Sequence, residues 1–119
     1  RTVLVVESHP EVRQLVAEVL DSAGYRVLHA DRAEQALELV SRRKDPIHLL
    51  LTGVQLAGMA GADLARRLRG QMPQLRVVFM SGLPEDESVS DPADAGASAF
   101  LLIPFAPRTL LARVRAALS

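Results

Sequence analysis

Residues 47–53 read Ile-His-Leu-Leu-Leu-Thr-Gly, an apolar run that ends in a glycine and leads into the glycine-containing loop 54–61. A short apolar run bounded by turn residues is typical of a strand buried on both faces of a parallel sheet. Four other runs have a similar composition, and we expect strands at residues 2–6, 25–30, 75–80 and 98–103. Segments with helical periodicity separate these runs, so the sequence predicts an α/β domain.

The helical segments in the first half are well marked. The first begins at Pro10 and has Gly24 as its left-handed stop. Its predicted buried face consists of Val12, Leu15, Val16, Val19 and Leu20. The second begins after Asp31, which together with Glu34 resembles a capping box.

In the second half of the chain, the sequence signals for helices differ in strength. A third helix spans about residues 62–69, and the last carries an apolar stripe between Leu110 and Leu118. Residues 84–96 contain one large apolar side chain and an interior proline, so the fourth helix is predicted to be short or broken. Right-handed crossovers favour a doubly wound sheet of five parallel strands in the order 2-1-3-4-5. A cleft is then expected at the carboxyl ends of strands one, three and four.

The composition limits the classes of function. The 119 residues suffice for a single domain, 1–119, and the start in a strand without an initiator Met leads us to expect a segment of a longer protein. Fourteen basic and fourteen acidic side chains give no net charge, which argues against nucleic-acid binding by this domain. No apolar stretch is long enough for membrane insertion, and cysteine is absent, which fits a cytoplasmic location. The histidines His9, His29 and His48 are scattered and predict no metal site.

Five features occur in an order that resembles the receiver domain of two-component signalling proteins. They are Pro10, Gly58-Met59, Gly61, Ser81-Gly82 and Pro104-Phe105. The resemblance covers nearly the whole chain and implies the flavodoxin-like receiver fold. It also implies a phospho-acceptor Asp after the third strand and two adjacent acids after the first strand, which hold Mg²⁺ with that Asp. A Ser or Thr after the fourth strand and a Lys before Pro-Phe complete the family's site.

The sequence departs from this pattern where the chemistry lies. Gly53 stands at the acceptor position, and Ile103 stands at the position of the Lys. Glu7 keeps the first acid, Ser8 replaces the second, and Ser81 keeps the switch hydroxyl. Phosphoryl transfer needs a nucleophile, a divalent cation and positioned donors. We therefore expect no catalytic residue, metal or cofactor in this domain, although Mg²⁺ is usual for the family.

These departures lead to one main hypothesis and two alternatives. The main hypothesis is a pseudo-receiver of a phosphorelay, which is not an enzyme and acts as a phosphorylation-independent protein-interaction module. The amino-acid sequence of residues 45–52 and 78–82 further resembles that of receivers at the C-terminus of hybrid sensor histidine kinases. One alternative is a small-ligand sensor that uses a cleft lined by Gly53, Ser81 and Ile103. The other is a residual phospho-switch with a different acceptor.

The resemblance also implies partners and two local details. The partners are a histidine kinase domain, a phosphotransfer protein or a second copy. They would bind the face made by the fourth helix, strand 98–103 and the last helix. Phe100 stands at the family's switch aromatic, although it lacks a hydroxyl group. The bond before Pro104 is expected to be cis, as it usually is in the family.

Overall fold

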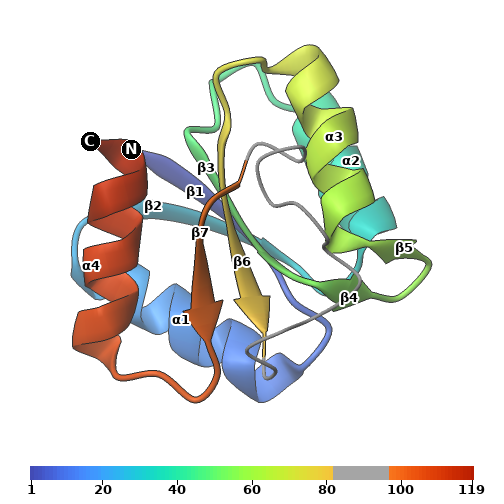
Figure 1. Ribbon diagram of the computed structural model, residues 1–119. Helices are drawn as coiled ribbons and strands as arrows, with labels where there is room; N and C mark the ends of the chain where they lie inside the picture. Colours follow the sequence, from blue (N-terminus) through green and yellow to red (C-terminus); the bar gives the residue numbers. More distant parts are fainter. Residues whose placement is uncertain (82–96) are drawn as a thin grey trace.

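The computed structural model describes residues 1–81 and 97–119, which form a parallel sheet with helices on both faces (Figure 1). Within these residues the main sheet has the strand order β2-β1-β3-β6-β7, and all its neighbours pair in parallel. The strands are β1 (Thr2–Val6), β2 (Arg26–Ala30), β3 (Leu49–Gly53), β6 (Arg76–Ser81) and β7 (Ala97–Leu102). This order confirms the predicted doubly wound 2-1-3-4-5 sheet.

Two apolar clusters hold the layers together. Helices α1 (Pro10–Ser22) and α4 (Pro107–Leu118) cover one face of the sheet, while α2 (Ala33–Ser41) and α3 (Gly61–Gln71) cover the other (Figure 1). Side chains alternate along a strand, so β1 and β3 contribute to both clusters. All residues of these two strands are buried, which explains why their sequences are apolar without interruption.

Helix α1 begins and ends as its sequence predicts, but its buried face is narrower. Pro10 opens the helix, and Gly24 follows it with φ of 95°, the predicted left-handed stop. Val16 and Leu20 are fully buried, whereas Leu15 is 45% exposed. The prediction that Leu15 faces the core is therefore wrong. Val16 and Leu20 lie one turn apart along the line of contact with the sheet, and Leu15 is rotated about 100° away from Val16.

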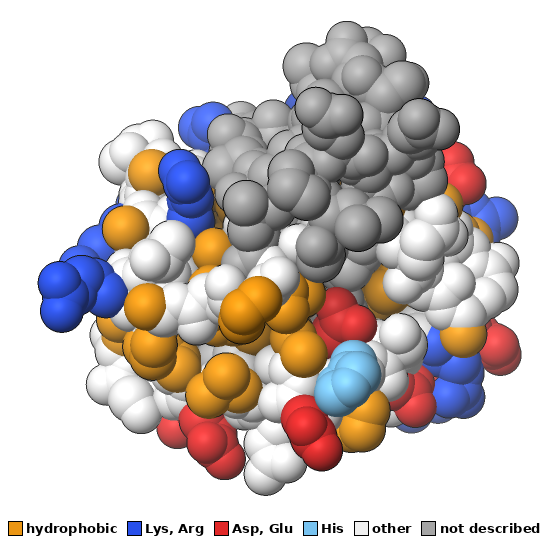
Figure 2. Space-filling model, turned by 60° about the horizontal axis from the view of Figure 1, so that its bottom comes forward, with side chains coloured by type: hydrophobic (Ala, Val, Ile, Leu, Met, Phe, Trp, Pro, Cys, Tyr) orange, Lys and Arg blue, Asp and Glu red, His pale blue; other side chains and the backbone are white. Residues whose placement is uncertain are grey.

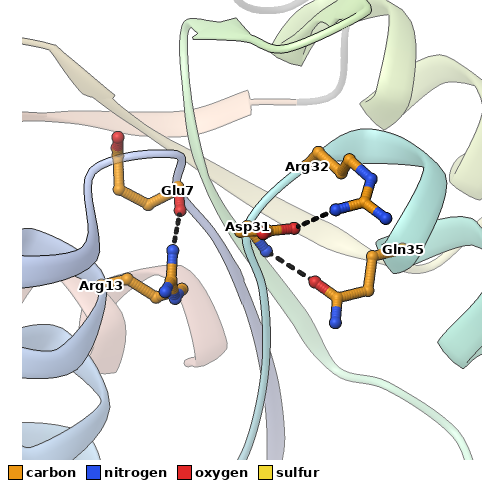
Figure 3. Close-up of polar contacts among 5 residues, drawn as sticks. All are labelled: Glu7, Arg13, Asp31, Arg32 and Gln35. Atoms are coloured by element: carbon orange, nitrogen blue, oxygen red, sulfur yellow. Dashed lines mark hydrogen bonds and ion pairs between the residues drawn. The ribbon is translucent and has the colours of Figure 1, made fainter.

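The start of α2 corrects a second expectation. Its N-cap is Arg32, which makes no capping bond through its side chain. Instead, the main-chain N–H of Asp31 donates to Oε1 of Gln35 at 2.8 Å, and Arg32 pairs with the Asp31 carboxylate at 3.1 Å (Figure 3). The predicted capping box of Asp31 with Glu34 is wrong, because the helix starts one residue later and Gln35 becomes its third residue.

The remaining elements differ from the predictions by small shifts. A hairpin of β4 (Gln55–Leu56) and β5 (Met59–Ala60) links β3 to α3, and its turn contains Gly58 with φ of 82°. Strand β3 begins two residues after Ile47, and α3 extends the predicted helix at both ends. The predicted short or broken helix within 84–96 lies outside the described residues. In the part of the chain that is described, no helix has the length and apolarity of a membrane span.

Candidate functional site

The predicted site positions come together at the carboxyl edge of the sheet. Glu7 follows β1, Gly53 ends β3, and Ser81 ends β6, and these three strands are neighbours. Ile103 follows β7, and its main-chain N–H donates to the carbonyl oxygen of Ser81 at 2.9 Å. In a parallel sheet all carboxyl ends lie at one edge, where ligand sites of this fold class form. The structure thus brings these predicted positions together at one edge of the sheet.

The Glu7 side chain turns towards Gly53. A Cβ atom built on Gly53 would lie 2.8 Å from Oε2 of Glu7 and 3.5 Å from a methyl carbon of Leu56. Glu7 is only 8% exposed, and its Oε1 accepts the main-chain N–H of His9 at 3.1 Å. The carboxylate therefore occupies the space that a side chain at position 53 would enter.

Arg13 approaches Glu7 from the other side. Its Nη1 donates to the main-chain carbonyl oxygen of Glu7 at 2.8 Å, while the Glu7 carboxylate points away from the guanidinium group (Figure 3). Among the residues that the structure describes, no Lys, Arg or His forms an ion pair with this carboxylate. Ser8, the next residue, is exposed and contributes a neutral hydroxyl group. Within residues 1–81 and 97–119, the carboxylate of Glu7 at the edge of the sheet therefore has no counter-ion.

The donor set does not fit the Mg²⁺ site that the family implies. Glu7 supplies the one carboxylate among positions 7, 8 and 53. Within residues 1–81 and 97–119, no three His, Asp or Glu side chains gather closely enough to hold a metal ion. Mg²⁺ requires oxygen ligands in a nearly octahedral array and loses its waters reluctantly. A single buried carboxylate beside a neutral hydroxyl group and a glycine is a poor match to that demand.

Gly61 and Thr52 fix the loop that follows β3. Gly61 opens α3, and its N–H donates to the carbonyl oxygen of Val54 at 2.7 Å. A Cβ atom on Gly61 would overlap the carbonyl oxygen of Gly53. The Thr52 hydroxyl donates to the same oxygen at 3.0 Å, and Thr52 is fully buried. Thr52 is therefore a structural residue of this loop and offers no exposed nucleophile beside Gly53.

The segment after β7 carries the position expected to hold a Lys. The side chain of Ile103 is partly buried and packs against the cluster under α1 and α4. The Ile103–Pro104 peptide bond is cis, the isomer expected from the sequence. Ser81 is 4% exposed. Phe100 pairs with Phe79 through the main chain of β7, and its side chain lies outside the description.

An apolar hollow of about 210 Å³ lies beside this segment. We call it the α1 hollow: it is lined by His9, Glu11, Val12 and Leu15 on one side and by residues 103–105 on the other. Figure 2 shows hydrophobic side chains gathered on this face, with acidic side chains and a histidine next to them. Neither Gly53 nor Ser81 lines it, so it is not the cleft that the small-ligand hypothesis describes.

The three histidines lie on different parts of the fold. His9 lines the α1 hollow, and His29 is exposed on β2. His48 lies at the opposite, amino edge of the sheet, where its Nδ1 accepts the main-chain N–H of Thr2 at 3.0 Å. His48 therefore joins β1 to the start of β3, a structural role that its sequence context did not indicate.

Comparison with known proteins identifies the family. The sequence model of the response regulator receiver domain matches residues 3–115. The chain belongs to this family. It is 31% identical over 120 residues to the phosphate regulon transcriptional regulatory protein PhoB of Pseudomonas aeruginosa, covering 99% of the chain and 52% of PhoB. It is 34% identical over 115 residues to the sensor kinase CckA of Brucella abortus, covering 96% of the chain and 12% of CckA.

The fold of this receiver domain also agrees with solved structures. The Vibrio cholerae chemotaxis protein CheY4 superimposes with a TM-score of 0.88 at 25% sequence identity, with 98% of each chain covered. This receiver spans about half the length of PhoB and a much smaller share of CckA. Receiver domains therefore occur in relatives of quite different length.

Sequence reasoning missed three features of this receiver. The direction of the Glu7 side chain, the contact of Gly61 with the Gly53 carbonyl group, and the exposure of Leu15 all depend on packing between distant segments. One signal was available in advance, since a glycine that opens a helix directly after a hairpin suggests a close approach of backbones.

Proposed function

We propose that this receiver domain does not accept a phosphoryl group and acts as a phosphorylation-independent regulatory module that binds other proteins. The observation that supports the proposal most directly is the geometry at the end of β3. Gly53 offers no side-chain atom there, and the Glu7 carboxylate fills the space where such a side chain would begin. A receiver of this kind is a signalling component rather than an enzyme, because it presents no acceptor for the transfer step.

The proposal is supported by the loss of three groups that act together in phosphoryl transfer. Gly53 replaces the nucleophile, Ser8 replaces an acidic metal ligand, and Ile103 places an aliphatic side chain where the family's ammonium group is expected. Loss of one preorganised donor typically lowers a rate by about 10²- to 10³-fold. Here nucleophile, metal ligand and donor are lost together, so we expect no measurable transfer.

The neighbouring oxygen nucleophiles do not offer a replacement. Thr52 is fully buried and its hydroxyl group donates to a main-chain carbonyl group. Ser81 is 4% exposed and Glu7 is 8% exposed. An attacking oxygen must reach the phosphorus atom of a phosphodonor in line with the leaving group. These three side chains are too deeply buried for that approach, which argues against a residual phospho-switch.

The relatives suggest the setting in which such a module works. Its similarity to both a transcriptional regulatory protein and a sensor kinase fits a domain carried by a longer signalling protein. We propose a cytoplasmic parent protein of the hybrid sensor histidine kinase type. The partner would be a histidine kinase domain, a phosphotransfer protein or a second copy of the domain.

The described residues favour the α1 hollow as a docking surface. Leu15 is the large hydrophobic side chain that stands exposed beside it, and Glu11 forms part of its rim. An exposed apolar patch rimmed by polar groups is a common mark of a protein contact site. The fourth-helix part of the predicted partner face falls within 82–96, outside the described residues. Substituting Leu15→Asp should weaken partner binding about tenfold, whereas Gln14→Asp on the same helix should not.

Amide NMR spectra with and without Mg²⁺ plus beryllofluoride test the central claim. Beryllofluoride mimics a phosphoryl group only where an acceptor carboxylate and Mg²⁺ hold it. We expect the resonances of Ser8, Gly53 and Ser81 to remain unchanged, because the domain lacks both the acceptor and a competent metal site.

A restored variant supplies the control for this experiment. The triple substitution Ser8→Asp, Gly53→Asp and Ile103→Lys rebuilds the family's pattern, and its resonances should shift and saturate with beryllofluoride. Saturable shifts near Gly53 in the unsubstituted domain would refute the proposal and favour a working phospho-switch. Shifts at Gly53, Ser81 and Ile103 upon addition of a small organic ligand would instead favour the ligand-sensing alternative.

A further inference from the structure

The two helices on one face of the sheet carry opposite charges. Helix α4 has three arginines, Arg108, Arg113 and Arg115, and no acidic residue. Helix α1 carries three acidic residues and one arginine. The two helices contact each other and lie together on one side of the sheet (Figure 1). An acidic helix therefore lies next to a basic helix on the same face of the molecule.

Two acids and two arginines on these helices are exposed with the same spacing. On α1 the exposed acids Glu11 and Glu18 lie seven residues apart. On α4 the exposed arginines Arg108 and Arg115 have the same separation. Seven residues are two turns of helix, so each pair forms a stripe about 10 Å long. Both helices run from the carboxyl edge of the sheet towards its amino edge, and the two stripes therefore run side by side in one direction.

The helix macrodipole does not account for this distribution of charge. A positive charge is unfavourable at the start of a helix, and a negative charge is unfavourable at its end. Arg108 nevertheless lies in the first turn of α4, and Asp21 lies in the last turn of α1. Among the described residues, no side chain forms an ion pair with either stripe. The pattern therefore favours partner charges on another molecule.

Apolar side chains lie between the two stripes. Leu15 is 45% exposed beside the α1 hollow, and Leu111 of α4 is partly buried in the cluster under both helices. In Figure 2 hydrophobic side chains lie between acidic side chains at the bottom and basic side chains at the left. The surface that we call the α1–α4 face consists of Glu11, Leu15, Glu18, Arg108, Ala112 and Arg115. An apolar centre with borders of opposite charge is complementary to a rotated copy of itself.

We infer that the α1–α4 face is an interface between two copies of this domain, related by a two-fold axis that runs along the groove between the helices. This rotation sets α1 of one copy on α4 of the other, so the two acids face the two arginines on both sides of the axis. Leu15 of one copy meets Leu15 of the other at the centre. A two-fold axis across the helices would set α1 on α1 and bring like charges together, so the charges select the first arrangement.

This inference deepens the proposed function, because it names a second copy as the partner, and it rests on that function only in treating the domain as a protein-binding module. The α1–α4 face shares only the last helix with the partner face expected from the sequence. Helices of 13 and 12 residues offer a surface about 20 Å long and about 20 Å wide. A permanent dimer buries more area, so we expect a reversible dimer with a dissociation constant of about 100 µM.

Analytical ultracentrifugation of the 119-residue chain tests the inference, with loading concentrations from about 10 µM to about 1 mM. We expect a dimer that grows with concentration and weakens in about 0.5 M NaCl, because salt screens exposed charges. Arg115→Glu and Glu18→Arg should each weaken the dimer about tenfold, because each sets like charges opposite one another twice in the dimer. The double variant Glu18→Arg with Arg115→Glu exchanges the two charges and should restore the association.

Arg113→Glu is the matched control for Arg115→Glu. Arg113 is exposed on the same helix, and it lies about 200° around the helix from Arg115, outside the α1–α4 face. The same change of charge there should alter the dissociation constant by less than about twofold. Far-ultraviolet circular dichroism checks that every variant is folded. Amide NMR spectra of the unsubstituted chain should show concentration-dependent shifts at Leu15 and Ala112.

A monomer at every concentration would overturn the inference, and so would a dimer that neither single reversal weakens. A double variant that stays dissociated would overturn the pairing of Glu18 with Arg115. The beryllofluoride experiment reports separately on the proposed function. A monomer whose resonances do not respond to beryllofluoride refutes this inference and leaves the proposed function standing. A dimer that binds beryllofluoride has the reverse meaning.

Discussion

Gly53 and Gly61 begin and end the loop after β3, and a side chain at either position would collide with its surroundings, but with different atoms. At Gly61 the obstacle is the carbonyl oxygen of Gly53, which belongs to the backbone and is braced by the Thr52 hydroxyl group. At Gly53 the obstacle is the end of the Glu7 side chain, which has rotatable bonds. The fold therefore requires a glycine at position 61. At position 53 only the present conformation of the Glu7 side chain stands in the way of a larger residue.

This difference separates a close contact between main chains from a close contact with the end of one flexible side chain. Gly61 allows the start of α3 to lie close to the carboxyl end of β3. Gly53 stands at the position where the resemblance to receiver domains implies the acceptor Asp. Substitutions at the two glycines should therefore differ in size and in their dependence on residue 7.

The largest effect is expected for Gly61→Ala. Its methyl group would overlap a backbone oxygen that cannot rotate away, so the free energy of unfolding should fall by about 3 kcal/mol. Urea unfolding monitored by circular dichroism measures this change. The loss should be the same with Glu7 or Ala at position 7. A loss below about 1 kcal/mol would mean that the loop relaxes easily and would remove the contrast with Gly53.

Gly53→Asp should have the next largest effect. The new carboxylate would enter beside that of Glu7, and repulsion between them should lower the free energy of unfolding by about 2 kcal/mol. Gly53→Asn has nearly the same volume without the charge, so the difference between the two variants isolates the repulsion. In the Glu7→Gln background the two variants should become equal. A difference that persists there would assign the cost to another acidic group.

Thr52→Val should have a smaller effect. Valine keeps the shape of Thr52 and removes the hydroxyl group that donates to the Gly53 carbonyl oxygen, which should cost about 1 kcal/mol of unfolding free energy. The amide resonance of Gly61 should shift as well, since this glycine abuts the same oxygen. Thr109→Val in α4, where the residue is exposed, is the control and should change stability much less. Equal changes would indicate that the hydroxyl group does not brace the loop.

The smallest effect, with the opposite sign, is expected for Gly70→Ala. This glycine lies in the last turn of α3 with open space around it. Alanine favours the helix and restricts the unfolded chain, so the free energy of unfolding should rise by about 0.5 kcal/mol. A thermal melt is sufficient to detect the gain. A clear loss would show that glycine itself, rather than the contact at Gly61 or Gly53, is favoured in this part of the chain.

Much of this picture could be predicted from the amino-acid order because the relevant signals are local. The apolar runs of β1 and β3 are continuous because both strands are buried on both faces. Pro10 and Gly24 bound α1 through restrictions on their own backbone angles. The site positions followed from the same order of strands, since parallel strands bring their carboxyl ends to one edge.

Predictions failed where the outcome depended on how one segment packs against another. Leu15 fits the helical pattern of α1 as well as Val16 does, but the line of contact with the sheet passes through Val16 and Leu20. Gln35 makes the bond to the start of α2 that Glu34 was expected to make, because the helix begins one residue later. A helical pattern alone cannot fix either choice to within one residue.

The sequence by itself determined the family, the order of the strands and the residue types at the candidate site, because these follow from residue types and their spacing. It specified a glycine, a serine and an isoleucine at positions 53, 8 and 103. Tertiary structure alone decided that the Glu7 carboxylate lies over Gly53, that Gly61 touches the backbone of β3, and that Leu15 stays exposed beside an apolar hollow. These facts depend on distances between side chains and backbones from different segments, and such distances exist only after the sheet and its helices have packed together.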